Sequence, residues 1–336
     1  MRILAIETSC DETAVAVLVG DGASVSVETS LVRSQIDIHQ AYGGVVPEVA
    51  AREHLEMVMP MLMRTARHDG EGIDAIAVTY GPGLAPALRV GVEAAKTLAW
   101  AWKKPLIPVC HLEGHIYASW IGTETPQFPV LALIVSGGHT ELVLMRDHGV
   151  FERLGETLDD AAGDAFDKVA KMLGLPYPGG PAVDRLAEKG NPHAFAFPRA
   201  MLDRDDCMFS FAGVKTSVLY ELRRQEEKLN DDAFRADIAA SFQEAVVDVL
   251  VQKTMRAAGK HQPASIVLAG GVAANVELRN RLKEAAANIG ISVFLPDFKY
   301  SLDNAAMIGV AGYFRAERDA AVDPLTLVAN PSADIV

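Results

Sequence analysis

The first nineteen residues predict a β-hairpin, because apolar residues fill positions 3–6, polar residues fill 7–13 and apolar residues return at 14–19. A third strand, a helix, a fourth strand and a second helix are expected after it. The helices are indicated by apolar residues at helical spacing, and the fourth strand leads into its helix through two glycines. The expected ranges, in chain order, are 2–19, 25–31, 48–67, 73–79 and 87–102.

The second half of the chain repeats this order of elements. A hairpin is expected over 131–145, then a strand over 265–269 that runs through Gly270 and Gly271 into a helix over 274–287. The repeat is one of topology, with little identity between the halves. The interval from hairpin to strand is longer in the second half, which predicts a mainly helical insertion over about 150–240.

The repeat predicts an α/β fold of two duplicated lobes with a ligand-binding cleft between them. We assign residues 1–112 to lobe I and 113–303 to lobe II. A C-terminal helix, about 304–320, is expected to pack on lobe I. The last dozen or so residues are expected to form a loose end without regular structure, on the evidence of Asp323-Pro324 and Asn330-Pro331-Ser332.

Composition narrows the possible functions. With 50% hydrophobic and 22% charged residues, the chain is expected to be folded throughout. Its 31 basic and 44 acidic residues give a net charge of −13. Such a charge argues against unaided non-specific binding to nucleic acid. No signal peptide or apolar run of bilayer length is present, and three scattered cysteines do not form a disulfide framework, so a cytoplasmic protein without membrane contact is expected.

A candidate metal site begins at His111 and His115, which follow an apolar strand-like run. At i and i+4 on a helix, two imidazoles lie on one face and can share an ion, while Glu113 points elsewhere. Asp303, just before the last predicted helix, would complete a two-histidine, one-carboxylate set. The alternatives are two ordinary histidines at a helix start and an aspartate that caps the next helix.

Both hairpin tips carry hydroxyl groups, and the second is rich in glycine. Ser136-Gly137-Gly138 can offer several backbone N–H groups to an anion, and Thr8, Ser9 and Thr13 of the first tip can do the same with their hydroxyls. Two such tips at equivalent positions favour a nucleotide over two simple tight turns. The chain contains neither G-x-G-x-x-G nor a P-loop.

Several polar residues of the second half could bind the rest of a nucleotide. Asp160, Asp164 and Asp167 share one face of a predicted helix, which could equally be a solvated face. A proline- and glycine-rich turn around Gly180 is expected to direct Asp184 back toward the ligand. The Asp184 carboxylate could accept hydrogen bonds from ribose hydroxyls. Asn275 could bond to ribose or base, or cap the helix that follows.

Taken together, these motifs resemble the TsaD family, also called the Gcp or Kae family. The resemblance covers about residues 1–318 and rests on nine ordered motifs. They are IETSCDET (6–13), GGVVPE (43–48), GPG (81–83), HLEGH (111–115), VSGGHT (135–140), DAAGDAFD (160–167), YPGGP (177–181), FSF (209–211) and AGGVAAN (269–275).

The resemblance implies a duplicated actin-like, sugar-kinase-like (ASKHA) fold and the activity of a tRNA N6-adenosine threonylcarbamoyltransferase. That enzyme moves the threonylcarbamoyl group of threonylcarbamoyl-AMP to N6 of the adenosine 3′ of the anticodon, in tRNAs that read codons beginning with A, and releases AMP. By the same resemblance His111, His115 and Asp303 would hold one divalent metal, iron or alternatively zinc. The residues implied for the adenylate are Ile134, Val135, Ser136, Gly137, Gly138, Asp167, Gly180, Asp184 and Asn275.

The resemblance also implies partners: a smaller paralogue, TsaB, and an ATPase, TsaE, as in bacterial members. The chain departs from the family by lacking its basic, proline-rich ending. No residue is identified as a general base. Three rival functions stay open from the residues: a zinc metalloprotease suggested by H-x-E-x-H, a small-molecule kinase of the same fold, and a nucleotide-dependent scaffold without catalysis.

Overall fold

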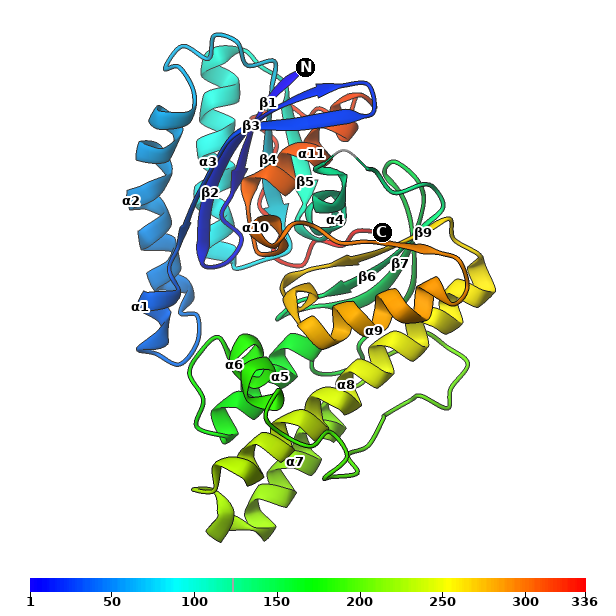
Figure 1. The fold of residues 1–336 in the computed structure, drawn as a ribbon. Coiled ribbons are helices and arrows are strands. Elements are labelled where there is room, and N and C mark those ends of the chain that lie inside the picture. Colours follow the sequence, from blue (N-terminus) through cyan, green and yellow to red (C-terminus); the bar gives the residue numbers. More distant parts are fainter. Residues whose placement is uncertain (123) are drawn as a thin grey trace. The chain divides into compact units, whose positions relative to one another are not determined.

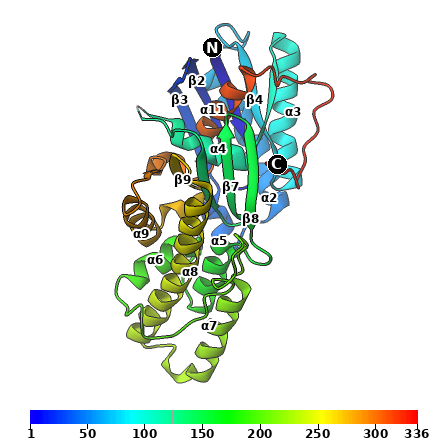
Figure 2. The ribbon, with the colours of Figure 1, turned by 90° about the vertical axis from the view of Figure 1, so that its right-hand side faces the viewer.

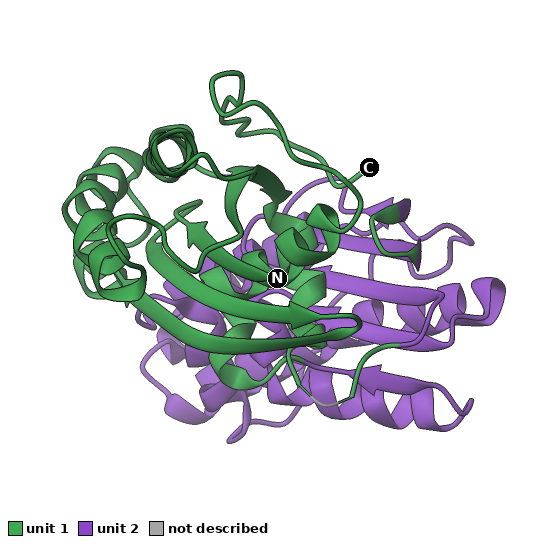
Figure 3. Ribbon diagram, turned by 90° about the horizontal axis from the view of Figure 1, so that it is seen from above, with its two compact units in different colours: residues 1–126, 147–150, 296–336 green, residues 127–146, 151–295 purple. Residues whose placement is uncertain are grey.

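Two five-stranded sheets with the same strand order form the fold of the computed structural model, which describes residues 1–122 and 124–336. The chain divides into two compact units (Figure 3). Unit 1 contains residues 1–126, 147–150 and 296–336, and unit 2 contains residues 127–146 and 151–295.

Unit 1 carries the sheet β3-β2-β1-β4-β5, in which the first three strands are antiparallel and β4 and β5 continue parallel to β1. Its strands are β1 (Arg2–Glu7), β2 (Glu12–Asp21), β3 (Ser24–Ser34), β4 (Ala75–Gly81) and β5 (Leu106–Cys110). Its helices are α1 (Ile36–Gln40), α2 (Pro47–Thr65), α3 (Ala85–Trp102), α4 (His111–Tyr117), η1 (Ala118–Trp120), α10 (Phe298–Ser301) and α11 (Ala305–Ala316).

Unit 2 carries the sheet β10-β9-β6-β7-β8, which has the same order when each strand is replaced by its counterpart. Its strands are β6 (Val130–Val135), β7 (Thr140–Asp147), β8 (Val150–Glu156), β9 (Ser265–Ala269) and β10 (Ser292–Phe294). Its helices are α5 (Ala162–Met172), α6 (Gly179–Ala187), α7 (Ala212–Arg224), η2 (Glu226–Lys228), α8 (Asp232–His261), η3 (Gly271–Ala274) and α9 (Val276–Ala287) (Figure 1). The duplication predicted from the sequence is therefore confirmed.

The sheet of unit 1 is covered on both faces, as its apolar strands require. Leu4 and Ile6 of β1 belong to the core beneath α2 and α3, whereas Ala5 lies close to Gly309 of α11. All of β1 from Ile3 onward is buried. The sheet therefore presents the ends of β1 and β4, and not their faces, to polar groups.

The predicted boundaries differ from the observed units at three places, one of which is residues 147–150, found in unit 1. Residues 113–126 lie in unit 1, because α4 packs against α11: a Cβ on Gly114 would come within 2.6 Å of Ile308. Residues 296–303 also belong to unit 1. The insertion is helical as expected, but α8 continues to His261, so a boundary at 240 would divide one continuous helix.

The C-terminal tail is not the loose end that its composition suggested. Its backbone bonds to the sheet and the loop after β4: Val322 donates to Leu106 (2.9 Å), Asn330 donates to Tyr80 (2.7 Å), and Pro331 accepts from Gly83 (3.2 Å). The tail then ends at the surface of unit 1 (Figure 2). In the part of the chain that the structure describes, no helix is long and apolar enough to span a bilayer.

Candidate metal centre and substrate-binding residues

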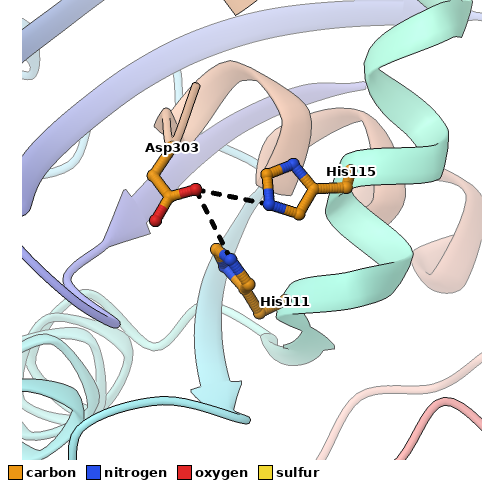
Figure 4. A group of neighbouring side chains, drawn as sticks. All are labelled: His111, His115 and Asp303. Atoms are coloured by element: carbon orange, nitrogen blue, oxygen red, sulfur yellow. Dashed lines mark ion pairs between the residues drawn. The ribbon is translucent and has the colours of Figure 1, made fainter. Parts of the chain in front are cut away.

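The metal candidates come together at one end of unit 1 (Figure 4). Helix α4 starts directly after β5, so His111 and His115 project from successive turns of one short helix. Asp303 lies just before α11, and its Oδ1 is 3.5 Å from His111 Nε2 and 3.3 Å from His115 Nε2. The three side chains predicted from the sequence are thus brought together by α4 and α11.

The capping interpretation of Asp303 is wrong, because the next residue does the capping. Asn304 Oδ1 accepts from Met307 N (2.9 Å) at the start of α11, and the Asn304 amide donates to the carbonyls of Tyr300 and Leu302. With the helix end already satisfied, the carboxylate of Asp303 is left to face the two histidines.

The donor set fits a divalent metal. The three ligand atoms lie within 4.8 Å of one another, and two imidazoles with one carboxylate match zinc and non-haem iron sites. Metal–ligand bonds of about 2.1 Å at tetrahedral angles separate neighbouring ligand atoms by roughly 3.4 Å, which is close to the observed spacing. The triad can therefore hold a divalent ion.

Glu7 orients His111, a role that the sequence analysis did not assign. Its Oε2 lies 3.2 Å from His111 Nδ1 and accepts from Thr79 Oγ1 (2.5 Å), while its Oε1 accepts from Ser9 N (2.5 Å). A carboxylate at Nδ1 holds the proton there and leaves Nε2 free for an ion. The signal in the sequence is an acidic residue that ends an otherwise apolar strand.

Charges within this group shift its pKa values in the metal-free chain. Burial opposes protonation of His111, but Asp303 and Glu7 outweigh it and raise the pKa of His111 to about 9. Burial would raise the pKa of Asp303, but His111 and His115 outweigh it and lower that pKa to about 2. In the metal-free chain the carboxylates of Asp303 and Glu7 therefore favour the protonated form of His111.

Glu113 faces away from both histidines, as predicted. It is buried and accepts from Arg315 Nη1 (2.7 Å). A metalloprotease needs a glutamate beside the metal, and this glutamate is paired elsewhere.

The hydroxyl groups of the first hairpin tip are engaged by the protein itself, unlike the phosphate-binding role expected for them. Thr8 Oγ1 bonds to α3, Ser9 Oγ lies 3.2 Å from His111 Nδ1, and Thr13 Oγ1 lies 2.7 Å from His54 Nδ1. All three threonine and serine residues are buried. The hydroxyl groups of the first tip therefore bond to the protein around His111 and are not free to bind an anion.

The second tip, in unit 2, is open. Gly137 and Gly138 are exposed, and a Cβ on either would meet no atom within 4 Å. The start of α5 lies close behind the tip, because Gly163 N donates to Ser136 O (3.2 Å). The tip is therefore accessible to a ligand, and anion binding there stays a prediction.

The other predicted nucleotide residues of unit 2 fall into three groups. Ile134 and Val135 are fully buried in β6, so only their backbone could meet a ligand. Asp167 accepts from Gly179 N (2.7 Å), next to Gly180 at the start of α6. Asp184 and Asn275 lie together.

Asn275 caps the helix that follows it, which is one of the two roles left open by the sequence, and its contact with ribose or base stays a prediction. Its Oδ1 caps α9 by accepting from Leu278 N (2.9 Å), and its amide donates to Asp184 Oδ1 (3.0 Å) and Gln243 Oε1 (2.9 Å). The cap explains why α9 begins at Val276, two residues later than predicted. Burial raises the pKa of Asp184.

Comparison with known proteins identifies the family. Residues 26–310 match the family described as "TsaD: tRNA N6-adenosine threonylcarbamoyltransferase". The chain belongs to the TsaD family. The tRNA N6-adenosine threonylcarbamoyltransferase of Moorella thermoacetica is 51% identical over 334 residues, which is 98% of this chain and 96% of that protein. The protein of the same name from Thermotoga neapolitana is 48% identical over 336 residues, with both chains fully covered.

Two solved structures of other proteins share the fold at low sequence identity. HypF from T. kodakarensis matches 94% of this chain and 47% of its own at a TM-score of 0.62 and 15% identity. A ROK hexokinase from Thermus thermophilus matches 95% and 100% at a TM-score of 0.50 and 15% identity. These likenesses confirm the actin-like, sugar-kinase-like fold.

Proposed function

We propose that the chain transfers the threonylcarbamoyl group from threonylcarbamoyl-AMP to N6 of the adenosine 3′ of the anticodon, in tRNAs that read codons beginning with A. The observation that carries the proposal is identity of about half to TsaD proteins over almost the whole length of both chains. The alternatives, a metalloprotease and a small-molecule kinase, are not favoured by these relatives. The paired Glu113 and the intact triad add support from the site itself.

The cofactor is one divalent metal held by His111, His115 and Asp303. We assign iron, with zinc as the alternative, as the resemblance to the TsaD family implies. The two-histidine, one-carboxylate set is typical of both metals. When bound, the ion supplies a Lewis acid that can polarise the carbonyl of the carbamoyl group.

The reaction needs one bond made and one broken. The N6 amine forms a bond to the carbamoyl carbon, the bond from that carbon to the phosphate oxygen breaks, and the amine loses one proton as AMP leaves. The backbone N–H groups of Ser136-Gly137-Gly138 are suited to the phosphate of the departing AMP, because the open glycines let an anion approach. Asp184 and Asn275, which lie together, are suited to its ribose.

The remaining adenylate contacts come from residues around the same helices. Asp167 accepts from Gly179 N at the turn before α6, beside Gly180, and Ile134 and Val135 contribute only backbone. No general base is assigned. Orientation of the amine is the main contribution left to the protein.

Partners follow from charge and family. A net charge of −13 disfavours unaided binding of a polyanion, so we propose that tRNA binds with the help of a TsaB-like paralogue and a TsaE-like ATPase. We place the protein in the cytoplasm, where tRNA is modified.

The test is transfer of labelled threonine, supplied as threonylcarbamoyl-AMP, to unmodified tRNA in the presence of both partners. Wild type is compared with His111→Ala and Asp303→Ala, and His68→Ala serves as the control because His68 is an exposed histidine of the same unit. Each variant is also titrated with Zn²⁺ and Fe²⁺. Label on tRNA is expected with wild type and the control, and loss of both transfer and tight metal binding with the two site variants.

Peptide and sugar acceptors are included in the same assay. Transfer absent from wild type with competent partners refutes the activity. Transfer retained by both site variants refutes the metal assignment and leaves the activity standing.

A further inference from the structure

Three buried polar side chains form a continuous hydrogen-bonded chain between α1, α2 and the first hairpin tip. His39, Gln35 and His54 are 0%, 2% and 0% exposed. His39 Nδ1 lies 3.3 Å from Val46 N and His39 Nε2 lies 3.1 Å from Gln35 Oε1. Gln35 Nε2 lies 3.3 Å from His54 Nδ1, and His54 Nε2 lies 3.0 Å from Cys10 O.

The backbone groups at the two ends of this hydrogen-bond network determine which ring nitrogen of each histidine carries the proton. A backbone N–H can only donate, so the bond from Val46 makes His39 Nδ1 an acceptor and places the ring proton on Nε2. Gln35 Oε1 accepts that proton, and the Gln35 amide then donates onward to His54 Nδ1. Since Cys10 O can only accept, His54 also carries its proton on Nε2. Both imidazoles are therefore neutral Nε2–H tautomers.

The acceptor end of the chain is the segment that orients a metal ligand. Cys10 follows Ser9, whose backbone N–H bonds to Glu7 and whose hydroxyl lies 3.2 Å from His111 Nδ1. Thr13, at the other side of the same segment, shares His54 Nδ1 at 2.7 Å. His54 thus holds the segment 9–13 at two points, one before and one after the acidic pair Asp11 and Glu12.

We propose that His54 is a positioning residue for the transferase reaction, which holds the first hairpin tip so that Ser9 and Glu7 keep the His111 ring in its metal-binding orientation. The proposal rests on the proposed function. Outer residues of this kind typically change metal affinity or activity by about 10–100-fold when they are replaced.

The arrangement works in one protonation state only. A proton on His54 Nδ1 would face the Gln35 amide, and turning that amide over would set its NH₂ against the Nε2–H of His39. The charged and titratable groups that face His54 are Glu7, Asp11 and His39; burial lowers its pKa, and the carbonyl of Cys10 and the two carboxylates oppose that shift. His54 is therefore neutral at neutral pH, as the chain requires.

The first measurement needs no variant and no activity. Nitrogen-15 spectra of the histidine rings in the wild-type protein at neutral pH should show His39 and His54 as neutral Nε2–H tautomers, with the signals assigned from His39→Phe and His54→Gln. An Nδ1–H or a protonated His54 overturns the proposal. This measurement tests the hydrogen-bond network even if the wild-type protein proves inactive. Inactivity would then refute the proposed function and leave the network standing.

The second measurement is kinetic and uses full-length protein with tRNA. His54→Phe keeps an aromatic ring and removes all three hydrogen bonds of His54, so kcat should fall about 10-fold or more while KM for tRNA stays within about twofold. His54→Gln can still donate to Cys10 and accept from Thr13, and it should recover most of the loss. The control is His68→Phe, an exposed histidine of unit 1.

A second variant, His39→Phe, is titrated with zinc in case His54→Phe unfolds the protein. His39 lies at the other end of the hydrogen-bond network. This variant should weaken zinc binding by a few-fold, since Gln35 loses the donor that orients it. An unchanged kcat in a folded His54→Phe, or equal losses in His54→Phe and His54→Gln, overturns the positioning role.

Discussion

Replacing Gly91 by alanine should destabilise unit 1, although alanine is the better helix former. Thr8 Oγ1 reaches into α3, where it donates to Ala87 O (3.0 Å) and accepts from Gly91 N (3.1 Å). The hydroxyl thus bridges two groups that would pair directly in a regular helix. A Cβ on Gly91 would lie 2.4 Å from that oxygen, too close for any real contact.

The magnitude follows from these contacts. Two buried hydrogen bonds contribute about 1 kcal/mol each, and displacing a buried side chain in a packed interior costs about 1–3 kcal/mol. Alanine regains about 1 kcal/mol of helix propensity over glycine. We expect Gly91→Ala to lower the free energy of unfolding by about 2–4 kcal/mol.

The assay is urea unfolding at constant pH, with two companion proteins. Gly259→Ala in α8 is the control: a Cβ there meets nothing within 4 Å, so it should raise stability by about 0.5–1 kcal/mol. In the double variant Thr8→Ala/Gly91→Ala the clash is removed and the direct helix bond can form, so it should be more stable than Gly91→Ala. The reasoning is refuted if Gly91→Ala is as stable as wild type, or if the double variant gains nothing.

Three further predictions concern other parts of the chain. Burial lowers the pKa of His54, so the unfolded chain binds a proton at a higher pH than the folded chain does. The stability of wild type relative to His54→Gln should therefore decline as the pH falls below about 6.5. A stability difference in urea unfolding that does not depend on pH would contradict this. Asn304→Ala removes the cap that accepts from Met307 N and should cost about 1–2 kcal/mol in the same assay; an unchanged midpoint would refute the capping role. Gly163→Ala places a Cβ 2.5 Å from Ser136 O, so AMP binding measured by calorimetry should weaken about 10-fold if one well-placed contact is lost; unchanged affinity would argue against this tip as the phosphate site.

The sequence predicted most of the fold because both sheets repeat one local pattern. Apolar spacing placed α2 and α3 within two residues at each end, and it placed the start of α11 within one residue. It did not place the tail, since its composition is that of a loop and its bonds go to Tyr80, Gly83 and Leu106, far away in the chain. Backbone pairing of this kind leaves no pattern in side chains.

The metal ligands were predictable to different degrees. His111 and His115 are joined by helical spacing, which is a local signal. Asp303 had no such local signal, because an aspartate before a helix is usually a cap, and only the structure shows that Asn304 takes that role. Glu7 was missed because its partner His111 lies 104 positions away.

The equal strand order of the two sheets has an evolutionary consequence. Strands β1 to β5 correspond one to one with β6 to β10, as expected if one ancestral gene was copied and joined to itself. The metal triad lies in unit 1, but it combines His111 and His115, which follow the last strand of the first copy, with Asp303, which follows the last strand of the second. The open glycine tip belongs to the second copy. A triad drawn from both copies requires that the halves be joined in one chain, and the long helical insertion lies in the second copy alone.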